Sequence, residues 1–148
     1  MPNQASPPES SAYYFDFDSS NGILRCRLEG DVTDESLKEC YDVACKYAAH
    51  TNPNVGIMDF SNVASFNVSS QTVRNLAYRT PHMPGSRPRF LVAPTTHVYG
   101  LARMFQEIGT EVRPELQVVR SMDEAYTRLG VPEPQFEAVG GGVAPGYR

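Results

Sequence analysis

The sequence lacks several features by which common classes of protein are recognised. It has no tryptophan, and no apolar run approaches the roughly 20 residues that a transmembrane helix needs. Its formal net charge is −4 and like charges do not cluster, whereas a general nucleic-acid binder or a polybasic membrane anchor needs a basic surface. We therefore expect no membrane span and no nucleic-acid partner.

Cysteine is also scarce. Cys26, Cys40 and Cys45 are an odd number without a Cys-x-x-Cys pair, and residues 1–11 have neither the basic nor the apolar region of a secretory signal. These features predict free thiols in a reducing cytoplasm, where disulfides are rare. We expect the thiols to be small buried apolar groups, with no metal and no cofactor bound.

The composition that remains is that of one globular domain. With 148 residues, 41% of them hydrophobic, the chain is long enough to bury a core. The hydrophobic periodicity extends over residues 12–130. Residues 1–11 are rich in Pro and Ser, and residues 131–148 are rich in Gly and Pro, so we expect a disordered N-terminal tail and a flexible C-terminal tail.

Five short segments have the pattern of β-strands. Apolar and polar residues alternate over residues 13–17, and Asn21-Gly22 predicts a tight turn into a second alternating strand at residues 24–28. Three later apolar runs have the length of buried strands; they cover residues 55–58, 90–93 and 116–119.

Four segments have helical spacing, each preceded by a residue whose side chain can cap a helix N-terminus. The predicted caps are Thr33, Ser69, Thr95 or Thr96, and Ser121. The order β-β-α-β-α-β-α-β-α predicts an α/β fold with an N-terminal β-hairpin, right-handed βα units and a mostly parallel five-stranded sheet with about four helices. Functional loops of such sheets follow the carboxyl ends of strands, here residues 59–70 and 94–99.

Charged residues of the predicted hairpin face one another. Arg25 and Arg27 lie on one face of the second strand, and Asp16 and Asp18 lie on the first strand. Cross-strand ion pairing is the simplest interpretation of these charges. An anion-binding site formed by the two arginines is the alternative.

Residues 55–80 join a buried strand to an amphipathic helix through a polar crossing at residues 61–62. Ser69 can cap this helix, with Val68 and Val73 at the positions of a hydrophobic staple. The cap also places a hydroxyl group at the positive end of a helix, where an anion is favoured. Ser69 is therefore either a structural N-cap or a phosphorylation site at the centre of a partner surface.

The same segment resembles the STAS domain of anti-sigma-factor antagonists, the SpoIIAA-like family, in a divergent branch. The resemblance extends in weaker form over residues 12–130, and the residues that carry it are Asp59, Ser61, Phe66, Ser69 and Ser70. It implies the SpoIIAA-like fold and a bacterial regulatory protein. In the family, a partner kinase phosphorylates the first serine of the pair, which is Ser69 here.

Two positions depart from the family pattern. The family usually has Asp before the serine pair and Gly after it, and this chain has Val68 and Gln71. Asp59 has two interpretations. It caps a local turn through Ser61 or nearby amides, or, as the resemblance implies, it shapes a polar site near the phosphorylated serine.

A second patch is expected beside the Ser69 loop. His97 and Tyr99 lie at the start of the predicted third helix, and Arg103 and Met104 lie outside its apolar stripe. Met and aromatic residues away from a core stripe suit a protein contact, and ordinary packing is the alternative. The predicted partner-binding residues are Asp59, Ser61, Ser69, Ser70, His97, Tyr99 and Arg103.

No set of residues predicts an enzyme. Ser69, His97 and Asp59 could be drawn as a catalytic triad, but such a set can be chosen in almost any domain. The glycines at 140–142 are followed by neither a helix nor a phosphate-loop lysine. We therefore expect a non-enzymatic protein. The resemblance implies an interaction module that docks a kinase or an anti-sigma-like regulator through the N-terminus of the Ser69 helix.

Binding of a small apolar ligand or a lipid is the alternative function, since the SpoIIAA-like fold is shared with SEC14-type lipid-binding domains. Those domains are considerably longer and use extra helices to wall a cavity. Here most apolar residues are needed for the core, and this favours the interaction module.

Overall fold

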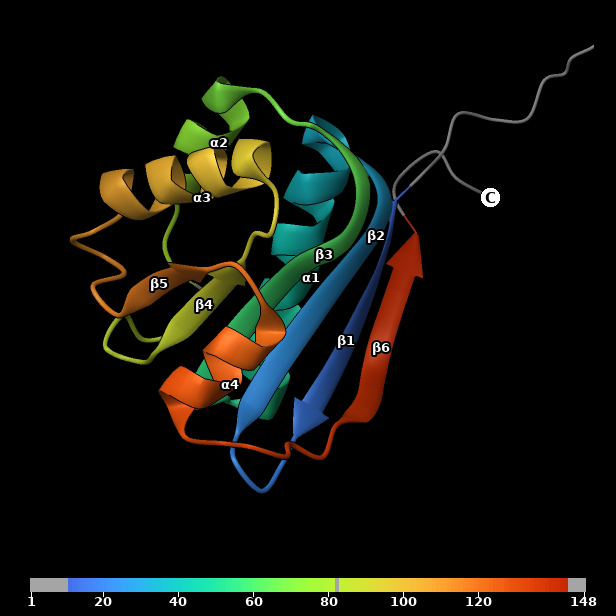
Figure 1. Ribbon diagram of the computed structural model, residues 1–148, viewed down its shortest axis with the longest axis vertical. Coiled ribbons are helices and arrows are strands. Elements are labelled where there is room, and N and C mark those ends of the chain that lie inside the picture. Colours follow the sequence, from blue (N-terminus) through green and yellow to red (C-terminus); the bar gives the residue numbers. More distant parts are fainter. Residues whose placement is uncertain (1–10, 82, 144–148) are drawn as a thin grey trace, which may run out of the picture.

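The computed structural model describes residues 11–81 and 83–143, so most of the segment predicted to be disordered at residues 1–11 lies outside the described residues. Within the described ranges, every helix is too short or too polar to span a membrane. The elements, shown in Figure 1, are β1 (Ala12–Asp18), β2 (Ile23–Thr33), α1 (Asp34–Thr51), β3 (Val55–Asn67), α2 (Ser70–Ala77), β4 (Arg89–Val92), α3 (Thr96–Ile108), β5 (Leu116–Val119), α4 (Met122–Leu129) and β6 (Glu137–Val143).

The strands form a sheet in the order β5-β4-β3-β2-β1-β6. Strands β2 to β5 are parallel to one another, and β1 runs antiparallel to both of its neighbours. The opening hairpin turns at Gly22, whose φ of +68° is rarely adopted by L side chains. The predicted α/β fold, with a hairpin followed by a mostly parallel sheet, is confirmed.

The sheet has six strands instead of the five expected from the sequence. The sixth, β6, lies within residues 131–148, which we expected to be a flexible tail, and it pairs with β1 along the edge of the sheet (Figure 1). Its glycines remove the alternating pattern that marks a strand. Packing requires one of them, because a Cβ at Gly140 would lie 1.7 Å from Tyr47 Oη.

Strands β2 and β3 are longer than the apolar runs that predicted them. Their parallel ladder continues past residues 61–62, through two register shifts, to the pair formed by Thr33 and Asn67. The residues that we interpreted as a polar crossing are therefore part of β3, held by backbone pairing with bulges. This extension carries the N-termini of α1 and α2 to the same end of the sheet.

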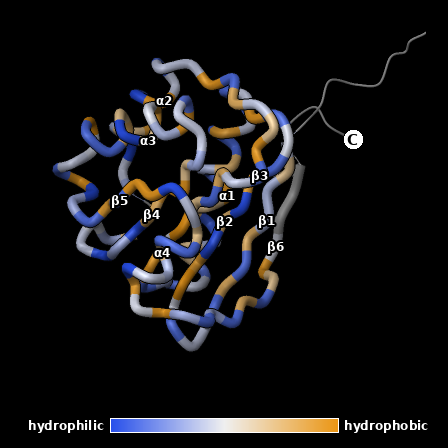
Figure 2. Tube along the Cα trace, viewed as in Figure 1, coloured by the Kyte–Doolittle hydropathy of each residue, from blue (hydrophilic) through white to orange (hydrophobic). Residues whose placement is uncertain are grey.

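Helices cover both faces of the sheet. α1, α2 and α3 pack on one hydrophobic cluster, and α4 packs on a second cluster on the opposite face. Figure 2 shows hydrophobic residues recurring along the central strands between these layers. In each helix the predicted cap accepts a hydrogen bond from the backbone N–H three residues later; the four caps are Thr33, Ser69, Thr95 and Ser121.

Candidate functional site

The N-termini of α1 and α2 meet where β2 and β3 end. Because these strands are parallel neighbours, the pair formed by Thr33 and Asn67 sets the first turns of the two helices side by side. The backbone N–H of Ser69 donates a hydrogen bond to Asp34 Oδ1 at 2.8 Å. This bond joins the cap of α2 to the first residue of α1 and lies at the centre of the candidate site.

Asp34 is held as a carboxylate at this junction. Its pKa is lowered chiefly by the hydrogen bond from the Ser69 N–H, and less by the side chains of Thr72 and Ser69 and by the charge of Lys38. The positive N-terminal ends of both helices favour the same charged form. The site therefore carries a fixed negative charge beside the Ser69 backbone.

Ser69 is the N-cap that the sequence predicts. Its Oγ accepts a hydrogen bond from the Thr72 N–H at 3.1 Å and donates one to Thr72 Oγ1 at 3.2 Å. Val68 and Val73 are buried beneath the cap, as a hydrophobic staple requires. Ser69 and Ser70 are nevertheless exposed, so this capped end of the helix is open to another protein.

The Asp-x-Ser pair forms a local turn. Asp59 is buried, and its Oδ1 accepts hydrogen bonds from the Ser61 backbone N–H at 2.9 Å and from the Ser61 hydroxyl at 2.6 Å. This geometry matches the structural interpretation of Asp59. In the part of the chain that the structure describes, no hydrogen bond connects Asp59 to Ser69.

His97 lies beside the end of β3. Its Nε2 is 3.2 Å from the Phe66 carbonyl oxygen, and its ring packs edge-on against the Phe66 ring with centroids 6.2 Å apart. The start of α3 thus contacts the strand that leads to Ser69. Among the described residues, His97 shares no hydrogen bond with Ser69 or Asp59, so the three side chains do not form a catalytic triad.

Tyr99 and Arg103 make their contacts elsewhere. The guanidinium of Arg120, which follows β5, lies over the Tyr99 ring with Cζ 4.0 Å from the centroid. Arg103 forms an ion pair with Glu107 at 3.6 Å. Within residues 11–81 and 83–143, neither has a hydrogen bond or ion pair to the segment that precedes α2.

Two large exposed side chains, one on α2 and one at its C-cap, were not singled out by the sequence analysis. Arg74 and Tyr78 are four residues apart and exposed, and Tyr78 exposes 71% of its surface. A hydrogen bond of 2.9 Å between the side chains of Gln71 and Asn75 lies on the same helix. The spacing of four residues, which places two side chains on one helix face, was the available signal.

Asp34 was also missed as a site residue. Its sequence position marks it only as an acid in the first turn of a helix, a common place for such a residue. Its contact with Ser69, 35 residues away in the sequence, follows from the pairing of β2 with β3, which no local pattern encodes.

The predicted cross-strand pairing is confirmed at Asp16. Arg25 donates two hydrogen bonds to the Asp16 carboxylate, at 2.9 and 2.6 Å, and Arg27 lies 3.7 Å from it. Asp18 was expected to pair with an arginine as well, and this is wrong. Its carboxylate accepts hydrogen bonds from the backbone N–H groups of the hairpin turn, because Asp18 is the last residue of β1.

The cysteines are free thiols. Cys26 and Cys40 are buried with their Sγ atoms 3.3 Å apart, and Cys45 is half-buried. Burial raises the pKa of the Cys26 thiol and keeps it protonated. The described residues contain no group of three or more His, Cys, Asp or Glu side chains placed to hold a metal ion.

Comparison with known proteins finds a similarity of fold. No family model matches the chain, and no curated protein is significantly similar in sequence. Among solved structures, the anti-sigma factor antagonist SpoIIAA in its unphosphorylated form superposes with a TM-score of 0.52 and 15% identity, over 74% of this chain and 90% of that chain. The chain therefore has the SpoIIAA-like (STAS) fold that the residues of its central segment predict.

Proposed function

We propose that this protein is a non-enzymatic regulatory module that docks a partner protein through its Ser69 surface, which comprises Ser69, Ser70, Arg74 and Tyr78. The observation that carries the proposal is the N-terminus of α2, where Ser69 caps the helix and remains exposed. The fold supports a regulatory role, because the similar solved protein is an anti-sigma factor antagonist. The expected partner is a kinase or an anti-sigma-like regulator, as the resemblance implies.

The chemistry of α2 fits a protein contact. Tyr and Arg are enriched among the residues that contribute most to protein–protein binding, and Arg74 of α2 and Tyr78 at its C-cap are exposed to solvent. The opposite face of the helix buries Val73 and Leu76 in the core. Because this packing fixes the helix, a partner can bind the exposed face without rearranging the fold.

Phosphorylation of Ser69 is the proposed switch of this surface. A phosphate carries roughly −1.5 to −2 charges near neutral pH, and it would lie next to the Asp34 carboxylate that accepts the Ser69 N–H. The N-terminus of α2 attracts a phosphate, whereas Asp34 repels it. We expect the modification to weaken the contact between Asp34 and Ser69 and to release a bound partner while the domain stays folded.

Capture of partners from the cells in which the protein occurs tests the proposal. The baits are the wild type, Ser69→Asp and Ser121→Asp. Ser121 is a matched control, because it caps α4 on the opposite face of the sheet by the same hydrogen bond. We expect a regulatory protein or kinase to bind the wild type and Ser121→Asp and to be lost with Ser69→Asp, and mass spectrometry of the bait to detect phosphate on Ser69.

Two results would contradict the proposal. If both Asp variants retain the same partners as the wild type, the partner does not dock at Ser69. If both variants lose the partners, the loss results from replacing any helix cap and does not locate the docking surface at α2.

A further inference from the structure

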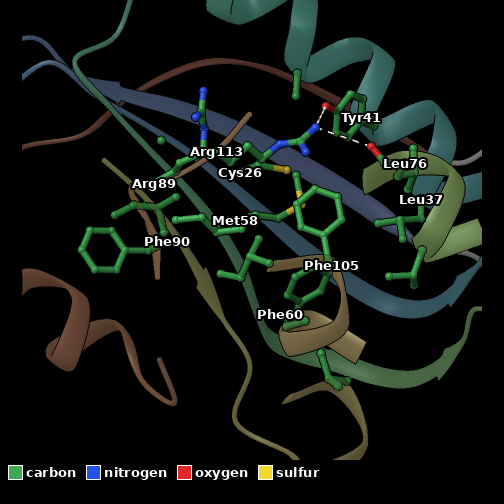
Figure 3. Close-up of a pocket in the computed structure, with 18 of the residues that line it drawn as sticks. Cys26, Leu37, Tyr41, Met58, Phe60, Leu76, Arg89, Phe90, Phe105 and Arg113 are labelled. Atoms are coloured by element: carbon green, nitrogen blue, oxygen red, sulfur yellow. Dashed lines mark hydrogen bonds between the residues drawn. The ribbon is translucent and has the colours of Figure 1, made fainter. Parts of the chain in front are cut away.

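A cavity of about 100 Å³ lies between the sheet and the helices α1, α2 and α3 (Figure 3). This volume is several times the roughly 30 Å³ that a water molecule occupies in the liquid, and protein interiors contain few voids larger than one water molecule. Most of the lining is apolar, with contributions from Leu24, Met58, Leu91 and Phe105. Figure 3 draws two arginines, Arg89 and Arg113, on the side away from Phe60; the position of the cations makes the cavity chemically asymmetric.

Arg113 is buried with only 2% of its surface exposed. Its guanidinium donates hydrogen bonds to the Ala77 carbonyl at 2.9 Å, to the Arg79 carbonyl at 3.0 Å and to Tyr41 Oη at 2.7 Å. It also lies 4.6 Å from the centroid of the Phe105 ring. The carbonyls at the C-terminus of α2 are partial negative charges, but none of these partners is a carboxylate.

Arg89 is buried as well, with 6% of its surface exposed. Its Nη2 donates to the Met83 carbonyl at 2.6 Å and its Nη1 reaches the Gly85 carbonyl at 3.5 Å. Its Nε is buried and has no hydrogen-bond partner among the described residues. Burial, followed by repulsion from the charge of Arg113, lowers the pKa of Arg89.

Two neighbouring cations therefore border an apolar cavity, and neither forms an ion pair in the described part of the chain. A buried charge without a counter-charge is strongly unfavourable. An anion at this end of the cavity would neutralise the pair. A carboxylate suits this role, because its hydrogen bonds to a guanidinium are charge-assisted and stronger than those between neutral groups.

We infer that the cavity binds a small carboxylate whose head group pairs with Arg89 and whose hydrocarbon part fills the apolar space. A dry cavity of about 150 Å³ in another protein holds benzene, so about 100 Å³ accommodates roughly four carbon atoms. A long-chain lipid, which the SEC14-type alternative would require, is too large for this space. The inference concerns the interior of the domain and does not depend on docking at the Ser69 surface.

Titration of the full chain with butanoate tests the inference. Binding is measured by calorimetry and by NMR of the methyl groups that line the cavity. 1-Butanol and n-butylammonium are the controls, because they also have four carbon atoms and carry a neutral or a cationic head group in place of the carboxylate. We expect saturable binding of butanoate at least about tenfold tighter than that of 1-butanol, since hydrogen bonds to charged groups are the stronger kind, and no binding of n-butylammonium.

Two variants locate the site. Arg89→Gln removes the proposed partner of the head group, and we expect it to abolish the preference for butanoate over 1-butanol. Ala102→Leu enlarges a lining residue and leaves both arginines in place, so it should weaken binding of both compounds. Arg128→Gln, which changes an exposed arginine of α4, should bind as the wild type does.

The inference is overturned if butanoate fails to saturate the wild type, if 1-butanol binds as tightly, or if Arg89→Gln keeps the preference. Circular dichroism establishes that each variant is folded. If Arg89→Gln does not fold, the head-group series on the wild type and the Ala102→Leu variant decide the question: retention of butanoate affinity by the folded Ala102→Leu protein would place binding outside the cavity.

Discussion

Replacing Gly140 by alanine tests whether β6 is held against α1 as the structure shows. The new Cβ would lie 1.7 Å from Tyr47 Oη and 2.5 Å from Tyr47 Cζ, so either Tyr47 or β6 must move. Tyr47 is restrained, because its ring packs on Phe15 with centroids 4.8 Å apart. Forced overpacking of this kind costs about 1–3 kcal/mol, and we expect the free energy of unfolding to fall by that amount.

Urea denaturation of Gly140→Ala beside Gly100→Ala measures this effect. Gly100 is the matched control, because a Cβ there meets nothing within 4 Å and the residue lies inside α3. Alanine in a helix interior is favoured over glycine by about 0.5–1 kcal/mol, so the two variants should change stability in opposite directions. If Gly140→Ala is as stable as the wild type and amide exchange along β1 is unchanged, the close approach of β6 to Tyr47 is refuted.

Three further predictions concern caps and titrating groups. Ser69→Ala and Ser121→Ala each remove an N-cap and should each lower the free energy of unfolding by about 1 kcal/mol in urea; no loss in either would contradict the observed capping. The lowered pKa of Asp34, due chiefly to the Ser69 N–H, stabilises the fold above the unfolded value of about 3.9, and this contribution is lost as the pH falls through the folded pKa. Asp34→Asn should therefore flatten the acid part of the stability–pH profile, and an unchanged slope would contradict the contact. Tyr13 has a pKa raised first by burial and then by its 2.7 Å hydrogen bond to Glu39, so its contribution to folding stability is present below the unfolded value of about 10 and is lost as the pH rises. Tyr13→Phe should therefore flatten the alkaline part of the stability–pH profile, and a profile that keeps its slope would argue against that bond.

Most of the fold was predictable because its signals are local. Each helix begins at a side chain that caps it, and each central strand is an apolar run between turn signals, so the sequence order of elements could be followed directly. The hairpin at Asn21-Gly22 and the cap at Ser69 are examples. The handedness of βα units then leaves few ways to assemble those elements.

The rest depends on contacts between distant segments. β6 forms because β1 offers a free edge and because Gly140 fits beneath Tyr47, and neither condition is visible in a glycine-rich stretch. The polar part of β3 is a strand because it pairs with β2. That same pairing sets Asp34 against Ser69.

The candidate site was predicted in part for the same reason. Ser69 and the Asp59–Ser61 turn are features of one segment, and their hydrogen bonds could be expected from it. Arg89 and Arg113 are different, because arginines are usually exposed and only the packed structure shows them buried beside one cavity. Tyr99 was expected near the Ser69 loop only because it lies at the start of its helix. In the structure its ring contacts Arg120 instead.

The central claim, docking through the exposed face of α2, is tested most directly by the affinity of a captured partner for the purified chain. The comparison is between the wild type, the double variant Arg74→Ala/Tyr78→Ala, and Arg128→Ala on α4 at the opposite face of the sheet. A residue that dominates an interface contributes about 2 kcal/mol or more, so the loss of one such contact alone makes the double variant bind at least about 30-fold more weakly. We expect Arg128→Ala to bind as the wild type does. Equal affinity of the double variant and the wild type would contradict docking at this surface.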